Sequence, residues 1–95
     1  MLFMVIERFR DSDPLPVYQR FQARGRLAPA GLKYISSWVS EDLTTCFQVM
    51  EAERKELLDE WMEQWVDLVD FEVVNVVGSE VASRRVLGER DGSKE

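Results

Sequence analysis

The order in which strand-like and helix-like segments follow one another limits this chain to few folds. Residues 2–9 are apolar on both faces for most of their length, which predicts a strand buried on both sides. Residues 33–39 and 44–51 each alternate between two kinds of side chain, and the polar residues 40–42 between them predict a hairpin. Residues 71–77 are branched and apolar, which predicts a last strand.

A helix is expected in each of the two longer connections. Residues 14–24 predict the first, because Asp13 suits the position before a helix and Pro14 suits its first turn. Residues 53–69 predict the second, because they carry an apolar stripe at helical spacing with acidic residues on the other side. The stripe consists of Leu57, Leu58, Trp61, Met62, Trp65, Leu68 and Val69.

The resulting order, strand, helix, strand, strand, helix, strand, is typical of a split βαβ unit, the ferredoxin-like βαββαβ fold of the α+β class. We expect a four-stranded antiparallel sheet in the order four-one-three-two, with both helices on one face. Residues 1–80 are expected to form this domain. Residues 81–95 are expected to add a short helix, capped by Ser79 and reaching about Leu87, and a disordered polar tail from Gly88.

One face of such a sheet has no helix over it, and we predict which side chains it carries. The purely apolar side of the hairpin is expected beneath the helices. It consists of Ile35, Val39, Phe47 and Val49. Glu7 is expected on the open face, since a carboxylate under a helix would lack a partner. The open face then holds Phe3, Val5, Glu7, Phe9, Tyr34, Ser36, Trp38, Cys46, Gln48 and Met50.

An open face with so many aromatic and aliphatic side chains is too large an apolar patch for a soluble monomer to expose to water. Two copies packed sheet to sheet would cover it, which is the dimeric α/β-barrel arrangement. We therefore expect a homodimer. Glu7, Trp38, Cys46 and Gln48 are expected to converge near one end of this face.

The composition excludes several classes of function. Charged residues make up 32% of the chain, and only six apolar residues precede Glu7, so we expect a cytoplasmic protein with no membrane partner. One cysteine and no histidine allow no internal disulfide, no His/Cys metal cluster and no Ser-His-Asp triad. We expect no cofactor. The net charge of −6 argues against nucleic acid as a partner.

The charge is unevenly spread, with a net of +3 over residues 1–38 and −9 over residues 39–95. The basic residues of the first part are Arg8, Arg10, Arg20, Arg24, Arg26 and Lys33. One interpretation is a solvated helix face and a sheet edge. The other is a mouth beside the first helix that attracts anions, or a surface that meets the acidic half of another subunit.

Glu7 is the candidate catalytic residue. A carboxylate on a largely apolar face can have a raised pKa and transfer protons. The alternative is a glutamate at the end of a strand that pairs with Arg8, Arg10 or an arginine of the first helix.

The candidate ligand-binding residues surround it: Tyr34, Ser36, Trp38, Cys46 and Gln48. Gln48 offers two donors and an acceptor to a ligand, or hydrogen-bonds to a neighbouring side chain or a water. Trp38 and Tyr34 either stack on a planar ligand or fill the dimer interface. Cys46 is more typical of a small buried hydrophobe than of a nucleophile, because no base is adjacent in sequence.

Four stretches of the chain resemble one family of small bacterial proteins. They are residues 1–9, 31–39, 46–51 and 65–74. Over about residues 1–80 the chain resembles the proteins called domain of unknown function 3303. That resemblance implies a compact α+β domain akin to dimeric α/β-barrel proteins. More distantly, the architecture looks like that of cofactor-independent monooxygenases and muconolactone-isomerase-type enzymes, an analogy of fold alone.

Three functions compete. The first is a homodimer that binds a small ligand between or beside its sheets without catalysis. The second is a cofactor-independent enzyme for a small aromatic or acidic substrate, with Glu7 moving protons and Gln48 and Tyr34 orienting the substrate. The third, a binder of single-stranded nucleic acid on the open sheet, is discounted. It needs central aromatic residues and a basic surround, whereas residues 44–51 offer Gln48 and Met50 in an acidic chain.

Overall fold

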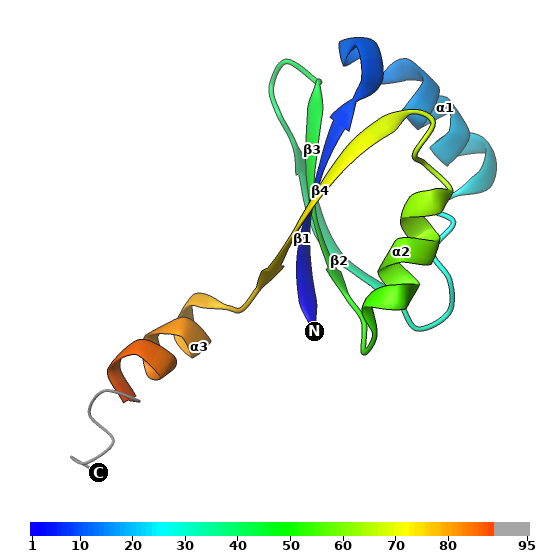
Figure 1. Cartoon of the computed structure of the whole chain (residues 1–95). Helices are drawn as coiled ribbons and strands as arrows, with labels where there is room; N and C mark the ends of the chain where they lie inside the picture. The colour runs from blue at the N-terminus through cyan, green and yellow to red at the C-terminus, as the bar shows by residue number, and fades with distance from the viewer. Residues whose placement is uncertain (89–95) are drawn as a thin grey trace.

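Four strands and three α-helices account for most of residues 1–88, which are the residues that the computed structural model describes. The elements are β1 (Leu2–Phe9), a 3-10 turn (Arg10–Ser12), α1 (Leu15–Arg24), β2 (Lys33–Val39), β3 (Thr45–Glu51), α2 (Lys55–Glu63), β4 (Val69–Val76), α3 (Ser79–Ser83) and a π-helical turn (Arg84–Gly88). The strands form one antiparallel sheet in the order β2-β3-β1-β4. Helices α1 and α2 cover one face of the sheet, and α3 extends away from its end (Figure 1). The predicted ferredoxin-like α+β fold is confirmed.

The second long helix is shorter than predicted, because the chain leaves it after Glu63 to enter the sheet. Two tight turns follow, in which the Trp65 N–H donates to the Met62 carbonyl at 2.9 Å and the Leu68 N–H donates to the Trp65 carbonyl at 2.9 Å. β4 then begins at Val69, which pairs with Phe9 of β1. This is two residues before the predicted start of the strand. Pairing with β1 therefore replaces the last turns that the apolar stripe alone would favour.

The C-terminal helix also differs in detail from its prediction. α3 begins at Ser79, but the residue before it is Gly78 and no side chain caps its first turn. The helix ends at Ser83, and the π-helical turn carries the chain to Gly88. The predicted tail lies outside the described residues from position 89 onward.

The hydrophobic core lies between the sheet and its two covering helices. Phe3 and Val5 of β1 and Met50 of β3 are each 0% exposed and pack with Leu58 and Trp61 of α2. The prediction of which face the helices cover is therefore wrong. Eight residues expected on the open face lie on the side that the helices cover: Phe3, Val5, Glu7, Phe9, Tyr34, Cys46, Gln48 and Met50. Phe47 and Val49, expected beneath the helices, lie on the other face of β3.

Glu7 accounts for the wrong prediction of the covered face. An unpartnered carboxylate under a helix would be costly. Glu7 has a partner, since Gln48 of β3 donates a hydrogen bond to it from the same side of the sheet. The penalty is thus reduced, and the two phenylalanines of β1, Phe3 and Phe9, lie on the covered side with Glu7.

A β-bulge in β2 divides the hairpin residues between the two faces. Tyr34 pairs with Met50 and Ser36 pairs with Val49, so Ile35 is an extra residue without a partner and is 45% exposed. Side chains alternate across a regular strand, so the extra residue places Tyr34 and Ser36 on opposite faces. Tyr34, Ser37 and Val39 lie on the helix side, whereas Ser36 and Trp38 lie on the open face.

The open face is nevertheless apolar, as predicted, but with a different set of residues. The set consists of Leu2, Met4, Ile6, Ser36, Trp38, Phe47, Val49, Val74 and Val76. Trp38 is 60% exposed and Val74 is 42% exposed. The face is bordered by ion pairs, of which the Arg8–Glu72 pair at 3.0 Å is one.

Candidate functional site

A pocket of about 130 Å³ lies on the helix side of the sheet, between β1, β3 and α1. Its polar lining consists of Glu7, Arg26, Ser37, Cys46 and Gln48. Its apolar lining consists of Phe9, Val17, Tyr18, Phe21, Val39, Trp61 and Trp65. Tyr18 and Phe21 of α1 are 48% and 42% exposed, whereas Glu7 and Gln48 are buried. The pocket, called the helix-side pocket below, therefore has its floor on the sheet and its mouth along α1.

Three side chains form a continuous chain of hydrogen bonds at the floor of this pocket. Gln48 Nε2 donates to Glu7 Oε2 at 2.5 Å, and Arg26 Nη1 donates to Gln48 Oε1. Glu7 is 7% exposed and Gln48 is 3% exposed. Burial raises the pKa of Glu7 from 4.5 to about 7, because loss of water outweighs the opposing effects of Gln48 and Arg26. A carboxyl with this pKa can either donate or accept a proton near neutrality.

The segment between α1 and β2 presents Arg26 to the pocket. Gly25 has φ +75° and ψ −164°, a conformation open essentially to glycine alone, and Leu27 has φ +64°. Between them the Arg26 carbonyl accepts the indole N–H groups of Trp61 and Trp65, at 2.9 and 3.1 Å. These two bonds tie the backbone at Arg26 to α2 and the turn after it. The position of the arginine is thus fixed by its main chain.

Two aromatic rings contact the Arg26 guanidinium. Its carbon lies 3.9 Å from the centre of the Tyr34 ring and 5.1 Å from that of Phe21. Both distances allow a cation–π interaction. The Tyr34 hydroxyl is 2.8 Å from the Ser37 hydroxyl oxygen, which holds the ring beside the arginine.

Cys46 lies next to Glu7 across the β1–β3 pairing and lines the same pocket. Burial, followed by the neighbouring Glu7 charge, raises the pKa of the Cys46 thiol to about 12. The sulfur is therefore a neutral thiol near neutrality and a poor nucleophile. Burial likewise raises the pKa of Tyr18, which keeps its hydroxyl available as a donor.

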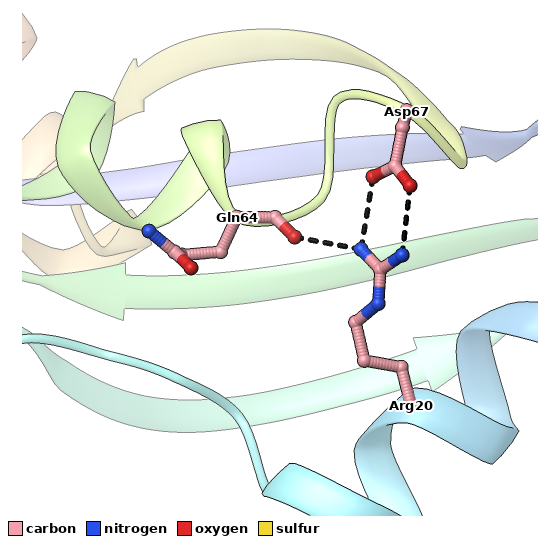
Figure 2. Close-up of polar contacts among 3 residues, drawn as sticks. All are labelled: Arg20, Gln64 and Asp67. Atoms are coloured by element: carbon pink, nitrogen blue, oxygen red, sulfur yellow. Dashed lines mark hydrogen bonds and ion pairs between the residues drawn. The ribbon is translucent and has the colours of Figure 1, made fainter.

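Arg20 fastens α1 to the segment after α2 and so fixes one wall of the pocket. Figure 2 shows its two terminal nitrogens facing Asp67, with bonds of 2.9 and 2.7 Å, while one of them also donates to the Gln64 carbonyl at 2.8 Å. The guanidinium also lies 5.5 Å from the ring of Trp65. Arg20 lowers the pKa of Asp67, so the pair stays ionised at neutral pH.

The structure brings some of the predicted site residues together and separates others. Glu7, Cys46 and Gln48 share the helix-side pocket, and Tyr34 reaches it through Arg26. Ser36 and Trp38 lie on the open face, so the predicted convergence of Trp38 with Glu7, Cys46 and Gln48 is wrong.

Sequence reasoning assigned the other residues of the pocket to no site: Phe9, Val17, Tyr18, Phe21, Arg26, Ser37, Val39, Trp61 and Trp65. Arg26 was named only within a set of six basic residues, for which one interpretation was a mouth beside the first helix that attracts anions. A glycine directly before it, at the end of a helix, was the available signal of a special backbone position. Trp61 and Trp65 are in the core, as predicted, and they also line the pocket.

Within residues 1–88, no group of three or more Cys, Asp or Glu side chains is arranged to hold a metal ion. No helix in the same range has the length and apolar character needed to cross a membrane.

The protein is a ferredoxin-like α+β domain with a chain of hydrogen bonds from Glu7 through Gln48 to Arg26 on the helix side of its sheet. The family model described as domain of unknown function (DUF3303) matches residues 1–88, and the chain belongs to that family. The family resemblance predicted from the sequence is thereby confirmed. Neither the curated proteins nor the solved structures contain a match to this chain.

The stability of the protein is expected to fall as the pH rises through the ionisation of Glu7. In the unfolded chain the carboxyl ionises near its ordinary pKa of 4.5, whereas in the folded protein its pKa is about 7. The folded state holds the extra proton between these values, so the stabilising contribution is complete at lower pH and lost above the folded pKa. A difference of this size corresponds to about 3 kcal/mol.

Urea unfolding of the wild type and of Glu7→Gln between about pH 4.5 and pH 8 measures this effect. The difference in unfolding free energy between the two proteins isolates Glu7 from the other titrating groups. We expect the wild type to lose about 3 kcal/mol relative to the variant across this range. A difference that does not change with pH would show that Glu7 ionises normally in the folded protein.

Proposed function

We propose that this protein is a homodimer in which each helix-side pocket binds one small ligand, with no reaction required. The observation that carries the proposal is the buried Glu7–Gln48–Arg26 chain beside an open pocket. The pocket lies beside the sheet, on its covered side, and the open face is left for the contact between copies.

The cost of burying ionisable groups supports a binding role. Well-packed apolar residues in place of a buried ionic network commonly leave a protein as stable or more stable. On the covered side of β1, Glu7 lies between Val5 and Phe9, and on β3 Gln48 lies next to Met50. These neighbours are apolar and buried, so apolar side chains would also fit at both positions. Polar groups converging on a mostly apolar pocket are the usual composition of a small-molecule site.

The size of the pocket limits the ligand. A cavity of roughly 150 Å³ can hold one benzene molecule, and the helix-side pocket has about 130 Å³. Its walls include five aromatic side chains, which come from β1, α1, α2 and the turn after α2. A ligand with a single ring or a short branched chain and one polar group fits these limits.

Ligand binding can be measured through the tryptophans of the pocket. In a Trp38→Phe background the remaining indoles are Trp61 and Trp65, which both line it. We expect one-ring alcohols and acids to change this fluorescence with dissociation constants of about 1 mM or tighter. Cys46→Leu, which fills the pocket while keeping its hydrogen-bond chain, is expected to weaken binding at least about tenfold.

Gln48→Leu is expected to weaken binding similarly, because it removes the amide that joins Glu7 to Arg26. Gln19→Leu is the matched control, since it makes the same chemical change at an exposed position of α1. Circular dichroism establishes that each variant is folded. Binding that survives Cys46→Leu unchanged would place the ligand elsewhere and contradict the proposal.

A cofactor-independent enzyme is the second candidate, and the observation that favours it is the Glu7 pKa of about 7. Such a carboxyl could remove a proton from a substrate at its Oε atoms while Gln48 and Arg26 stabilise the developing anion. Incubation with one-ring acids and enols, followed by mass spectrometry and solvent deuterium exchange, tests this. Exchange that follows the ionisation of Glu7 and disappears in Glu7→Gln would favour the enzyme. Binding without exchange would favour the binding protein.

The homodimer is supported by the open face. Its apolar side chains extend across all four strands, and patches of this kind on soluble proteins usually mark contact sites. Both charge signs border it, as in the Lys33–Glu51 pair at 3.9 Å, so a second copy related by a two-fold axis can meet it without like charges opposed. We propose a second copy of this chain as the occupant, in the cytoplasm, where the free thiol of Cys46 stays reduced.

Light scattering coupled to size exclusion tests the homodimer. We expect the mass of two chains for the wild type and of one chain for Phe47→Glu, because the new charge lies within the open face. Val66→Glu is the matched control, since Val66 is 47% exposed and lies in the turn between α2 and β4. This control is expected to remain dimeric. A wild type of single-chain mass at concentrations up to about 0.5 mM would contradict the homodimer and leave the ligand proposal in place.

A further inference from the structure

Arg26 brings to the helix-side pocket a positive charge that no carboxylate neutralises at contact distance. Five ion pairs occur within residues 1–88, and Arg26 takes part in none of them. Its acceptor is the neutral amide oxygen of Gln48, and its guanidinium carbon lies over the rings of Phe21 and Tyr34. An arginine stays charged inside a protein and can form several hydrogen bonds at once. The site therefore favours an anion with two acceptor oxygens.

Glu7 supplies the complementary group at the other end of the Gln48 amide. Its Oε2 accepts the Gln48 N–H, so one side of its carboxyl is engaged by the sheet. The carboxyl as a whole lines the pocket. When the Glu7 carboxyl is protonated, its O–H can donate a hydrogen bond to a carboxylate oxygen of a ligand, so that the two groups share one proton. The two polar groups thus define a position for a carboxylate between a cation and an acid.

We propose that the helix-side pocket binds a small aromatic monocarboxylate, held by Arg26 and a protonated Glu7, and that a proton is taken up on binding. This inference rests on the ligand-binding function proposed above and specifies its ligand class. The ring of the ligand lies against the apolar walls, where Trp61, Phe9 and Val17 come from three different elements. A cationic ligand is repelled by Arg26, and a neutral one forms no ion pair with it.

The proton uptake follows from the groups that face Glu7. Those groups are Gln48 and Cys46 from β3, Arg26 from the segment before β2, and Tyr18 from α1. Cys46 and Tyr18 remain neutral near pH 7, and β4 presents the apolar Phe71 opposite Glu7. A bound carboxylate adds a negative charge beside the Glu7 carboxyl, and two carboxylates at close range cannot both stay ionised. Glu7 then takes the proton.

Isothermal titration calorimetry with benzoate, benzyl alcohol and benzylamine tests the inference on the whole wild-type chain. Benzoate is expected to bind at least about tenfold more tightly than benzyl alcohol, and benzylamine most weakly. Titrations in two buffers with different ionisation enthalpies give the proton count. We expect close to one proton taken up per benzoate at about pH 8 and close to none at about pH 6, where Glu7 is already protonated. Benzoate affinity should fall about tenfold per pH unit above neutrality.

Glu7→Gln separates the acid from the pocket shape. A glutamine amide donates an N–H at every pH, so benzoate is expected to bind this variant with no proton uptake and no dependence on pH over the same range. Arg26→Gln is expected to lose the preference for benzoate over benzyl alcohol, whereas Arg26→Lys, which keeps the charge but not the planar fork of donors, is expected to retain part of that preference. Arg24→Gln is the matched control, because Arg24 is exposed in the last turn of α1.

The outcomes distinguish this inference from the function on which it rests. Benzyl alcohol binding as tightly as benzoate, or benzoate binding without proton uptake at about pH 8, overturns the inference and leaves a ligand-binding pocket. Failure of all three probes to bind counts against both. The ligand ratio and the proton count are measured on the wild type, so they decide the matter even where an Arg26 variant does not fold.

Discussion

The amide of Gln48 joins two ionisable groups that neither the sheet nor the helices could cover separately. It donates to Glu7 on β1 and accepts from Arg26 on the segment before β2, so one side chain satisfies a partner on each side. A buried polar network is tolerated when its members are bonded to one another, and costly when one is left alone. Because Gln48 makes both bonds, the helices can cover the face that contains Glu7. The aliphatic side chains of the opposite face, such as Met4 and Ile6, are thereby left outside.

The pocket and the core share the same supports. Trp61 and Trp65 are 2% and 5% exposed, and they fill the space between α2 and the sheet. Their indole N–H groups both donate hydrogen bonds to the Arg26 carbonyl oxygen, so core residues fix the backbone of the pocket at Arg26. On the far side, Arg20 fastens α1 through Asp67 and the Gln64 carbonyl, as Figure 2 shows. The site is thus held by contacts on both sides, and its most exposed lining residues, Tyr18 and Phe21, lie on α1.

Local periodicity was enough to predict the strands and the first helix, because each of these depends on neighbouring residues, and the family was predicted from the resemblance of four stretches of sequence. The face of the sheet was not predictable in the same way. β1 is apolar on both sides, so its alternation does not indicate which side the helices cover. The hydrogen-bond partner that allows Glu7 to be covered, Gln48, is 41 positions away in β3. The end of α2 was predicted wrongly for a related reason, since the pairing of Val69 with Phe9 outweighs the local helical pattern. Among the site residues, Glu7, Cys46 and Gln48 were correctly grouped because they share parity on paired strands.

The bulge at Ile35 gives the sheet a position where the length of the chain can vary. In the regular strands of this fold, removing one residue would exchange the two faces of everything beyond it. Ile35 has no partner, and Tyr34 and Ser36 already occupy consecutive places opposite Met50 and Val49. A chain without Ile35 would keep Tyr34 beside Arg26 and Trp38 on the open face, at the cost of the extra twist that a bulge adds. A sequence one residue shorter at this point could therefore keep the same side chains of β2 on the helix side and on the open face.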